Sequence, residues 1–579
     1  MNRGRRYLML AAICLLSGCT EPRTASDGGT PDESTTAQIL PERKVEQTKG
    51  IDAVVDMGSG QVLPGPATPA ESRRRLQKMT AGAAPQVATA EMVAPMPPPM
   101  NTESYNPNRE MGFVAVGNDP LSTFSIDVDT ASYSNIRRFI EQGSLPPAGS
   151  VRIEEMINYF DYDYPQPDKG PFSLTLEGGL CPWQPEHRLV RIGLQAKDVE
   201  KKNLPPSNLV FLIDVSGSMS DPDKLPLLKR AMALLVDQLD GSDRVAIVAY
   251  AGSERVVLPP TAGSDRKTLL AAIDTLESGG STHASQGIVT AYQLARQTFM
   301  PGGNNRVILA SDGDFNVGVT SRGELEKLVE RERQSGVYLT LLGFGEGNYH
   351  DDTMEILADR GNGNYAYIDS LLEAKKVLVK EMGGTMFALA GDVKIQVEFN
   401  PAQVAAYRLI GYENRAMADE EFNDDTKDAG EIGVGHRVTA LYEVVPAGVK
   451  APVSVDPLKY RQAAKPAESV EELLTVKVRY KPLQQQASTM IERSLGSAGR
   501  ELDHASDDFR FAAAVAAFGM RLGDSAYLNG YAYGDILELA RGARGEDREG
   551  WRAEFVRLVE TSEMLEQAAE DRGAAGSVK

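Results

Sequence analysis

Three short polar segments of the sequence carry side-chain oxygens in patterns that suit a small, hard metal ion. The first segment places a carboxylate and two hydroxyls on alternate residues, at Asp214, Ser216 and Ser218. Alternate residues of a tight loop can face the same way, so these oxygens can converge on one cation. The second segment adds the hydroxyl of Thr282, and the third adds the carboxylate of Asp312. We expect these residues to form one site for Mg²⁺, or for Mn²⁺, because both ions take oxygen ligands.

Each polar segment adjoins an element that would hold it in place. Asp214 ends the apolar run of residues 209–213, and Asp312 ends a second apolar run at 305–311. Short apolar runs bounded by turn residues are typical of strands that are buried on both faces. Thr282 comes just before a stretch whose apolar residues have helical spacing. Sites in open α/β sheets form at the carboxyl ends of the strands, so we expect the three loops to meet at one edge. Three unrelated loops are the alternative.

Strand and helix patterns alternate between residues 203 and 384, which predicts an α/β domain with a doubly wound parallel sheet. The alternating pattern of β-strands occurs before this segment, at 171–202, and again after it, at 385–485. We expect these strands to pair in one β-sandwich that flanks the α/β domain or receives it as an insertion. Residues 111–170 form a further N-terminal segment with strand and helix patterns, and residues 500–570 have the spacing of core-facing helices.

The three polar loops, in this order, resemble the metal-ion-dependent adhesion site of von Willebrand factor type A (VWA) domains, here within 203–384. The resemblance implies that an ion bound there keeps an open position. A carboxylate from an Asp or Glu of a protein partner would take that position. Ser216 and Ser218 would bind the ion directly, and Thr282 would bind it directly or through water. The two aspartates would bind through water or hold the serine hydroxyls.

The N-terminus has the pattern of a bacterial export signal. Basic residues and a short apolar run make up residues 1–18, and this run is too short for a stable membrane anchor. The run ends in a sequence that resembles the lipobox of bacterial lipoproteins, with Cys19 as the lipidated residue. Thr20, rather than an aspartate, follows the cysteine, which favours the outer membrane and the periplasm. A plain secretory signal or a cytosolic start is the alternative. Residues 19–110 are poor in large apolar side chains and are predicted to be a disordered tether.

Composition and motifs exclude some classes of function. The net charge of −20 argues against a nucleic-acid groove. The sequence contains no nucleophile elbow, zinc-protease helix or phosphate-binding loop. Its five histidines are scattered, and hydroxyl-rich ligation is poor for activating water. We therefore do not expect an enzyme.

Several separate blocks resemble the YfbK-like bacterial VWA lipoproteins. They include residues 119–140, 151–165 and 509–520, and the resemblance extends over about 112–559. It implies an N-terminal segment, a VWA domain and a C-terminal domain. We expect a membrane-anchored module that binds an unknown protein partner through its metal site. Two alternatives are an envelope scaffold whose metal site is structural and, less favoured, a metal-dependent hydrolase.

Overall fold

The computed structural model describes residues 103–577, except 106–108, 281–283, 314–321, 348, 454–470, 483–484, 486 and 497–500. The chain divides into two units, 1–94 and 95–579, and all described residues lie in the second unit. The predicted signal peptide, Cys19, Thr282 and most of the predicted tether therefore lie outside the described residues. Within the described part of the chain, no helix combines the length and the apolar character needed to cross a bilayer.

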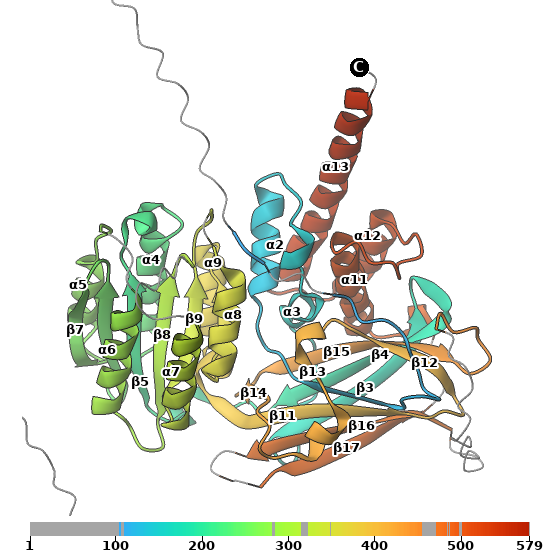
Figure 1. Cartoon of the computed structure of the whole chain (residues 1–579), viewed down its shortest axis with the longest axis horizontal. Helices are drawn as coiled ribbons and strands as arrows, with labels where there is room; N and C mark the ends of the chain where they lie inside the picture. The colour runs from blue at the N-terminus through green and yellow to red at the C-terminus, as the bar shows by residue number, and fades with distance from the viewer. Residues whose placement is uncertain are drawn as a thin grey trace, which may run out of the picture. The chain divides into compact units, whose positions relative to one another are not determined.

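The α/β domain contains a six-stranded sheet in the order β10-β9-β8-β5-β6-β7 (Figure 1). Five strands are parallel, as predicted, but the edge strand β7 runs antiparallel to β6. The sequence did not predict β7, because Pro259 and Pro260 weaken its strand pattern, and an edge is where a sheet tolerates proline. The strands are β5 (Ser207–Asp214), β6 (Arg244–Tyr250), β7 (Glu254–Ala262), β8 (Asn304–Ser311), β9 (Tyr338–Gly343) and β10 (Tyr365–Tyr367).

Helices cover both faces of this sheet because successive residues of each strand point to opposite sides. Leu209, Phe211 and Ile213 of β5 pack with α4, α5 and α9 in one core. Val210 and Leu212 pack with α6, α7 and α8 in another. The doubly wound prediction is therefore confirmed. The helices are α4 (Leu225–Val236), α5 (Arg266–Asp274), α6 (Ala284–Gln297), α7 (Arg322–Gln334), α8 (Asp351–Arg360), α9 (Leu371–Lys375) and α10 (Met382–Met386), with a π-helical turn at Lys376–Lys380.

Strands from both sides of the α/β domain form a two-sheet sandwich around a shared apolar core. The first sheet has the order β1-β12-β15-β4-β3, and the second has the order β13-β2-β11-β16-β17, with β14 paired to β11. Because β4 pairs with β15 and the α/β domain lies between them in sequence, the domain is an insertion, as predicted. The bounds are β1 (Val114–Ala115), β2 (Leu121–Ser125), β3 (Phe172–Cys181), β4 (Gln184–Ala196), β11 (Ala388–Phe399), β12 (Val404–Ile410), β13 (Ala416–Met417), β14 (Gly430–Gly433), β15 (Arg437–Pro446), β16 (Glu472–Pro482) and β17 (Thr489–Gly496).

A third core joins helices from the two ends of the described chain. N-terminal helices α2 and α3 pack with α11 and α12 and with the first half of α13, whose C-terminal end extends away from its neighbours (Figure 1). Arg137 of α2 links this core to the α/β domain by bonding to Asp369 and Glu373, and it also bonds to Glu554 of α13. The helices are α2 (Ala131–Glu141), α3 (Ile153–Asn158), α11 (Asp507–Leu522), α12 (Tyr533–Gly542) and α13 (Trp551–Ser577).

Residues 103–105, near the end of the predicted tether of residues 19–110, are attached to the α/β domain. Ser104 forms a parallel bridge with His350, and its amide donates to the carbonyl of Tyr349 at 3.0 Å. The Glu103 carboxylate accepts from the amide of Gly347 at 2.8 Å and pairs with Arg138 of α2 at 3.1 Å. Residues 103–105 are therefore fixed to the loop that follows β9.

Where the chain leaves the α/β domain at Gly384, its backbone packs tightly against Gly433 and His436. A Cβ on Gly433 would overlap the carbonyl of Gly384, and a Cβ on Gly384 would overlap the His436 ring. His436 is half-buried, and its Nδ1 finds no partner among the described residues. Burial, with the positive charges of Lys376 and Arg437, lowers the pKa of His436 to about 4.

We predict that His436 makes the fold sensitive to acid. The unfolded chain protonates this imidazole below about pH 6.5, whereas the folded chain does so only below about 4. Stability should therefore fall as the pH drops from 6.5 to 4, by at most about 3 kcal/mol. His436→Gln should flatten this slope in urea unfolding measured at several pH values. His504→Gln, at an exposed histidine, is the control, and equal slopes in the wild type and both variants would contradict the prediction.

Candidate metal centre

Asp214 lies at the carboxyl end of the central strand β5 and is fully buried. Its Oδ1 accepts from the amide of Ser216 at 2.8 Å, and its Oδ2 accepts from the hydroxyl of Ser311 at 3.2 Å. Burial raises the pKa of the Asp214 carboxyl to about 6, and the negative charge of Asp312 adds to the rise. The carboxylate is thus held in a fixed orientation, close to a second negative charge.

The loop after β5 brings the two predicted serines together. The Ser216 and Ser218 hydroxyl oxygens lie 2.9 Å apart. Backbone hydrogen bonds fix this loop to the second predicted segment, because the amide of Gly217 donates to the carbonyl of Gly280 at 3.1 Å. Thr282 follows two residues later and lies outside the described residues. The observed contacts therefore bring the first two of the three predicted loops together.

Asp312 follows β8, the strand beside β5, and is also fully buried. Its Oδ2 lies 3.0 Å from the ammonium of Lys224, whose side chain is only 5% exposed. Gly345 lets this lysine reach the site, since a Cβ on Gly345 would overlap the lysine's aliphatic chain. Lys224 was not among the predicted site residues. Its one sequence signal is its position directly before the apolar pattern that begins α4 at Leu225.

The donor set suits a divalent cation. Four of the predicted residues, Asp214, Ser216, Ser218 and Asp312, lie at the carboxyl ends of two neighbouring parallel strands (Figure 1). Among the described contacts, the buried ammonium of Lys224 pairs with one of the two buried carboxylates, that of Asp312. Among the described residues, no three or more His, Cys, Asp or Glu side chains are grouped as metal ligands. The serine hydroxyls of Ser216 and Ser218 are the other described oxygens of the predicted ligand set.

Comparisons with known proteins agree with this arrangement of domains. The profile of the family described as "von Willebrand factor type A domain" matches residues 208–380, and that described as "von Willebrand factor" matches residues 99–191. The profile described as "Uncharacterized protein YfbK, C-terminal" matches residues 384–565.

Two relatives and two solved structures are similar to parts of the chain. "Uncharacterized protein YfbK" of Escherichia coli strain K12 is 45% identical over 458 residues, which is 77% of this chain and 79% of the relative. "Uncharacterized protein sll0103" of Synechocystis is 28% identical over 32% of this chain and 43% of its own length. A von Willebrand factor type A structure from Catenulispora acidiphila is 16% identical and covers 67% of this chain and 89% of its own, with a TM-score of 0.36. The ArnB paralog VWA2 from Sulfolobus acidocaldarius is 14% identical and covers 68% and 98%, with a TM-score of 0.34.

We predict that Lys224 and Asp312 stabilise the fold only as a pair. Asp312→Ala would leave the buried Lys224 ammonium with only the distant, exposed carboxylate of Asp221 at 3.9 Å, which should cost about 3 kcal/mol of unfolding free energy. In the double variant Asp312→Ala/Lys224→Met, part of that loss should be recovered because the buried ammonium is removed together with its partner. Urea unfolding in the presence of a chelator measures both values. A double variant less stable than Asp312→Ala would show that the ion pair does not set the stability.

Proposed function

The chain belongs to the family of the E. coli protein YfbK, which it matches over 77% of its length, and it contains a VWA domain. We propose that this domain captures a protein partner through a divalent-metal adhesion site. The observation that supports this most strongly is the convergence of two buried carboxylates and two serine hydroxyls at one sheet edge. Thr282 would complete the ligand set from the neighbouring loop.

The residues of the site divide the work of holding a cation. The Ser216 and Ser218 hydroxyls would bind the cation. Asp214 holds Ser216 in place by accepting a hydrogen bond from its backbone amide. Lys224 compensates the charge of Asp312, so the site places little net negative charge around the cation. When bound, Mg²⁺ or Mn²⁺ supplies an open, positively charged position for an Asp or Glu carboxylate of the partner.

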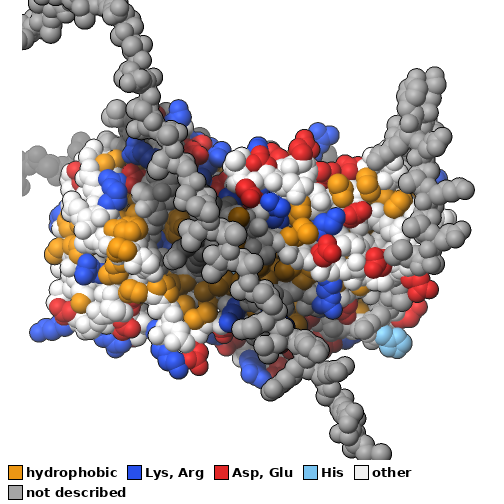
Figure 2. All heavy atoms as spheres, turned by 90° about the horizontal axis from the view of Figure 1, so that it is seen from below, with side chains coloured by type: hydrophobic (Ala, Val, Ile, Leu, Met, Phe, Trp, Pro, Cys, Tyr) orange, Lys and Arg blue, Asp and Glu red, His pale blue; other side chains and the backbone are white. Residues whose placement is uncertain are grey.

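We further propose that Cys19 carries a lipid and that the protein faces the periplasm from the outer membrane. The export signal of residues 1–18 and the lipobox-like ending support this. Nucleic acid is not proposed as a partner, since the net charge is −20 and basic and acidic side chains are interspersed on the face drawn in Figure 2. Catalysis is not part of the proposal, because the ligand set is rich in hydroxyls.

A second candidate function is that of an envelope scaffold whose metal site is structural. Lys224 favours this alternative, because a built-in ammonium already compensates one of the two buried carboxylates. In a scaffold, chelation would lower the melting temperature but leave partner binding unchanged.

We predict one divalent-metal site per chain that depends on the serine hydroxyls. Calorimetric titration of the purified full-length protein with Mg²⁺ and Mn²⁺ should show a single site. Asp214→Ala should abolish binding, and Ser218→Ala should weaken it about tenfold because one direct ligand is lost. Ser220→Ala, at an exposed serine of the same loop, is the matched control and should bind as the wild type does. Unchanged binding by Asp214→Ala would refute the assignment.

We also predict that partner capture needs both the cation and a carboxylate. Wild-type protein, Ser218→Ala and Ser220→Ala would be crosslinked in envelope extract, in Mg²⁺ and in chelator. Wild type and Ser220→Ala should retain the same partner in Mg²⁺, whereas chelator or Ser218→Ala should release it. Amidation of the extract's carboxyl groups should also prevent capture. Equal recovery in every condition would leave the scaffold as the better description.

A further inference from the structure

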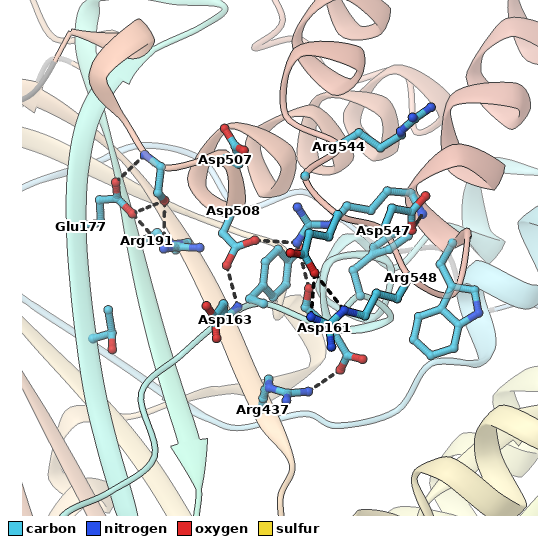
Figure 3. Close-up of a pocket in the computed structure, with 18 of the residues that line it drawn as sticks. Asp161, Asp163, Glu177, Arg191, Arg437, Asp507, Asp508, Arg544, Asp547 and Arg548 are labelled. Carbon is cyan, nitrogen blue, oxygen red and sulfur yellow. Dashed lines mark hydrogen bonds and ion pairs between the residues drawn. The ribbon is translucent and has the colours of Figure 1, made fainter.

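A second candidate site lies in a cavity of about 1040 Å³ between the sandwich and the C-terminal helices (Figure 3). One wall is formed by β3 and β4, and the opposite wall by the starts of α11 and α13 and the loop of residues 544–549. None of its lining residues belongs to the candidate metal centre. The cavity is at the upper end of the size range of small-ligand pockets, so it can hold a ligand of several residues.

Arg191 of β4 is a buried charged side chain in the lining of this cavity, and the described contacts leave some of its donors without an acceptor. Its side chain is 5% exposed, and its Nη2 donates to Glu177 of the neighbouring strand at 2.8 Å. The guanidinium also lies over the Tyr164 ring, with 5.1 Å from its Cζ to the ring centroid. These contacts fix the guanidinium, but its Nε and Nη1 have no hydrogen-bond acceptor among the described residues.

Thr175 of β3 provides a further donor beside Arg191. Glu177 lies directly opposite Arg191 across the β3–β4 pair, and Thr175 lies opposite Gly193. Residues two apart on a strand share a face, so Thr175 and Arg191 are diagonal neighbours on the face that lines the cavity. The Thr175 hydroxyl is buried and likewise lacks a partner within the described part of the chain.

Buried donors without an acceptor are rare in native proteins, because each one loses its bond to water without replacement. Around this cavity the other described basic side chains are mostly satisfied by acids. Arg552 pairs with Asp508 at 2.5 Å, and Lys380, Arg437 and Arg548 also have acidic partners. Arg544 is exposed to solvent, so the buried donors that lack an acceptor among the described lining residues are those of Arg191 and Thr175, on the β3–β4 wall.

We propose that this cavity binds a peptide that carries a free carboxylate, with the carboxylate at Arg191 and Thr175. Because Glu177 already pairs with the guanidinium, the Nε and Nη1 that lack an acceptor among the described residues suit a singly charged acceptor better than a doubly charged phosphate, which the carboxylates of Glu177 and Asp508 would repel more strongly. The cavity is much larger than one carboxylate, and its lining includes paired acids and bases that can form hydrogen bonds with the polar groups of a peptide chain. Binding at this site is independent of the metal centre.

Trp551 makes the proposal measurable. It lines the cavity and is one of two tryptophans in the chain, and the other, Trp183, is 4% exposed and bonded to Glu443. The probes are two random heptapeptide libraries, one with free C-terminal carboxylates and one with C-terminal amides and no acidic residues. Each would be passed over immobilised full-length protein in chelator, and retained peptides would be titrated individually by tryptophan fluorescence.

The carboxylate library should be retained, and its peptides should bind at least about tenfold more tightly than their amides. Arg191→Gln and Thr175→Val should each reduce this preference, while Arg188→Gln, on the same strand but outside the cavity, should not. Thr175→Val removes only a hydroxyl and keeps the test valid if Arg191→Gln unfolds. Acetate should compete better than inorganic phosphate at equal concentration.

Three outcomes would overturn the proposal. They are equal retention of the two libraries, a preference that survives both cavity variants, and stronger competition by phosphate than by acetate. Asp214→Ala should bind the peptides as the wild type does, so failure of the metal centre would leave this result unaffected.

Discussion

The buried guanidinium of Arg137 is the contact on which the joining of distant parts of the chain depends. It bonds to Asp369 at 2.6 and 2.7 Å, to Glu373 at 2.7 Å, and to Tyr159 and Glu554 at 2.9 Å. These partners come from the α/β domain, the segment after α3 and α13, so one side chain links three parts of the chain. A cation in this position is tolerated because all of its donors are bonded, and losing one acidic partner would leave a buried donor without its acceptor. The inserted α/β domain is thus attached to the rest of the structure by buried ion pairs as well as by the two chain connections, after β4 and before β11.

Much of the fold could be predicted because the apolar pattern of each central strand shows which of its faces are buried. β5 and β8 are apolar on both faces, and a polar residue ends each of them, so both the sheet and the sheet edge of the site could be predicted. The short or proline-containing edge strands could not be predicted this way, because an edge strand needs neither continuous burial nor every backbone hydrogen bond. The pairing of β4 with β15 could be expected only in general terms, since local spacing does not specify partners across an inserted domain.

In the candidate centre, residues on one short loop could be predicted, whereas a residue whose partner is distant in the sequence could not. Alternate spacing indicated Asp214, Ser216 and Ser218, because all three lie on one short loop. Lys224 could not be predicted, because its partner Asp312 is 88 residues away and a lysine before a helix is typical of solvated surface. Arg191 could not be predicted for a similar reason, since its proposed role in binding depends on which of its donors the folded chain leaves without an acceptor. Pairing in three dimensions, rather than residue type, separates these cations from ordinary surface charges.

The attachment of Glu103 and Ser104 has a structural consequence. The chain that precedes them enters the folded part at the loop carrying Tyr349, and a Cβ on Gly313 would lie 2.9 Å from the ring of that tyrosine. Gly313 directly follows Asp312 in the sequence. The hydrogen bonds of Glu103 and Ser104 therefore attach this end of the described chain to the loop that follows β9. The loop that holds Glu103 and Ser104 is thus also the loop packed against the residue after Asp312, so the N-terminal attachment and the candidate centre share one structural neighbour.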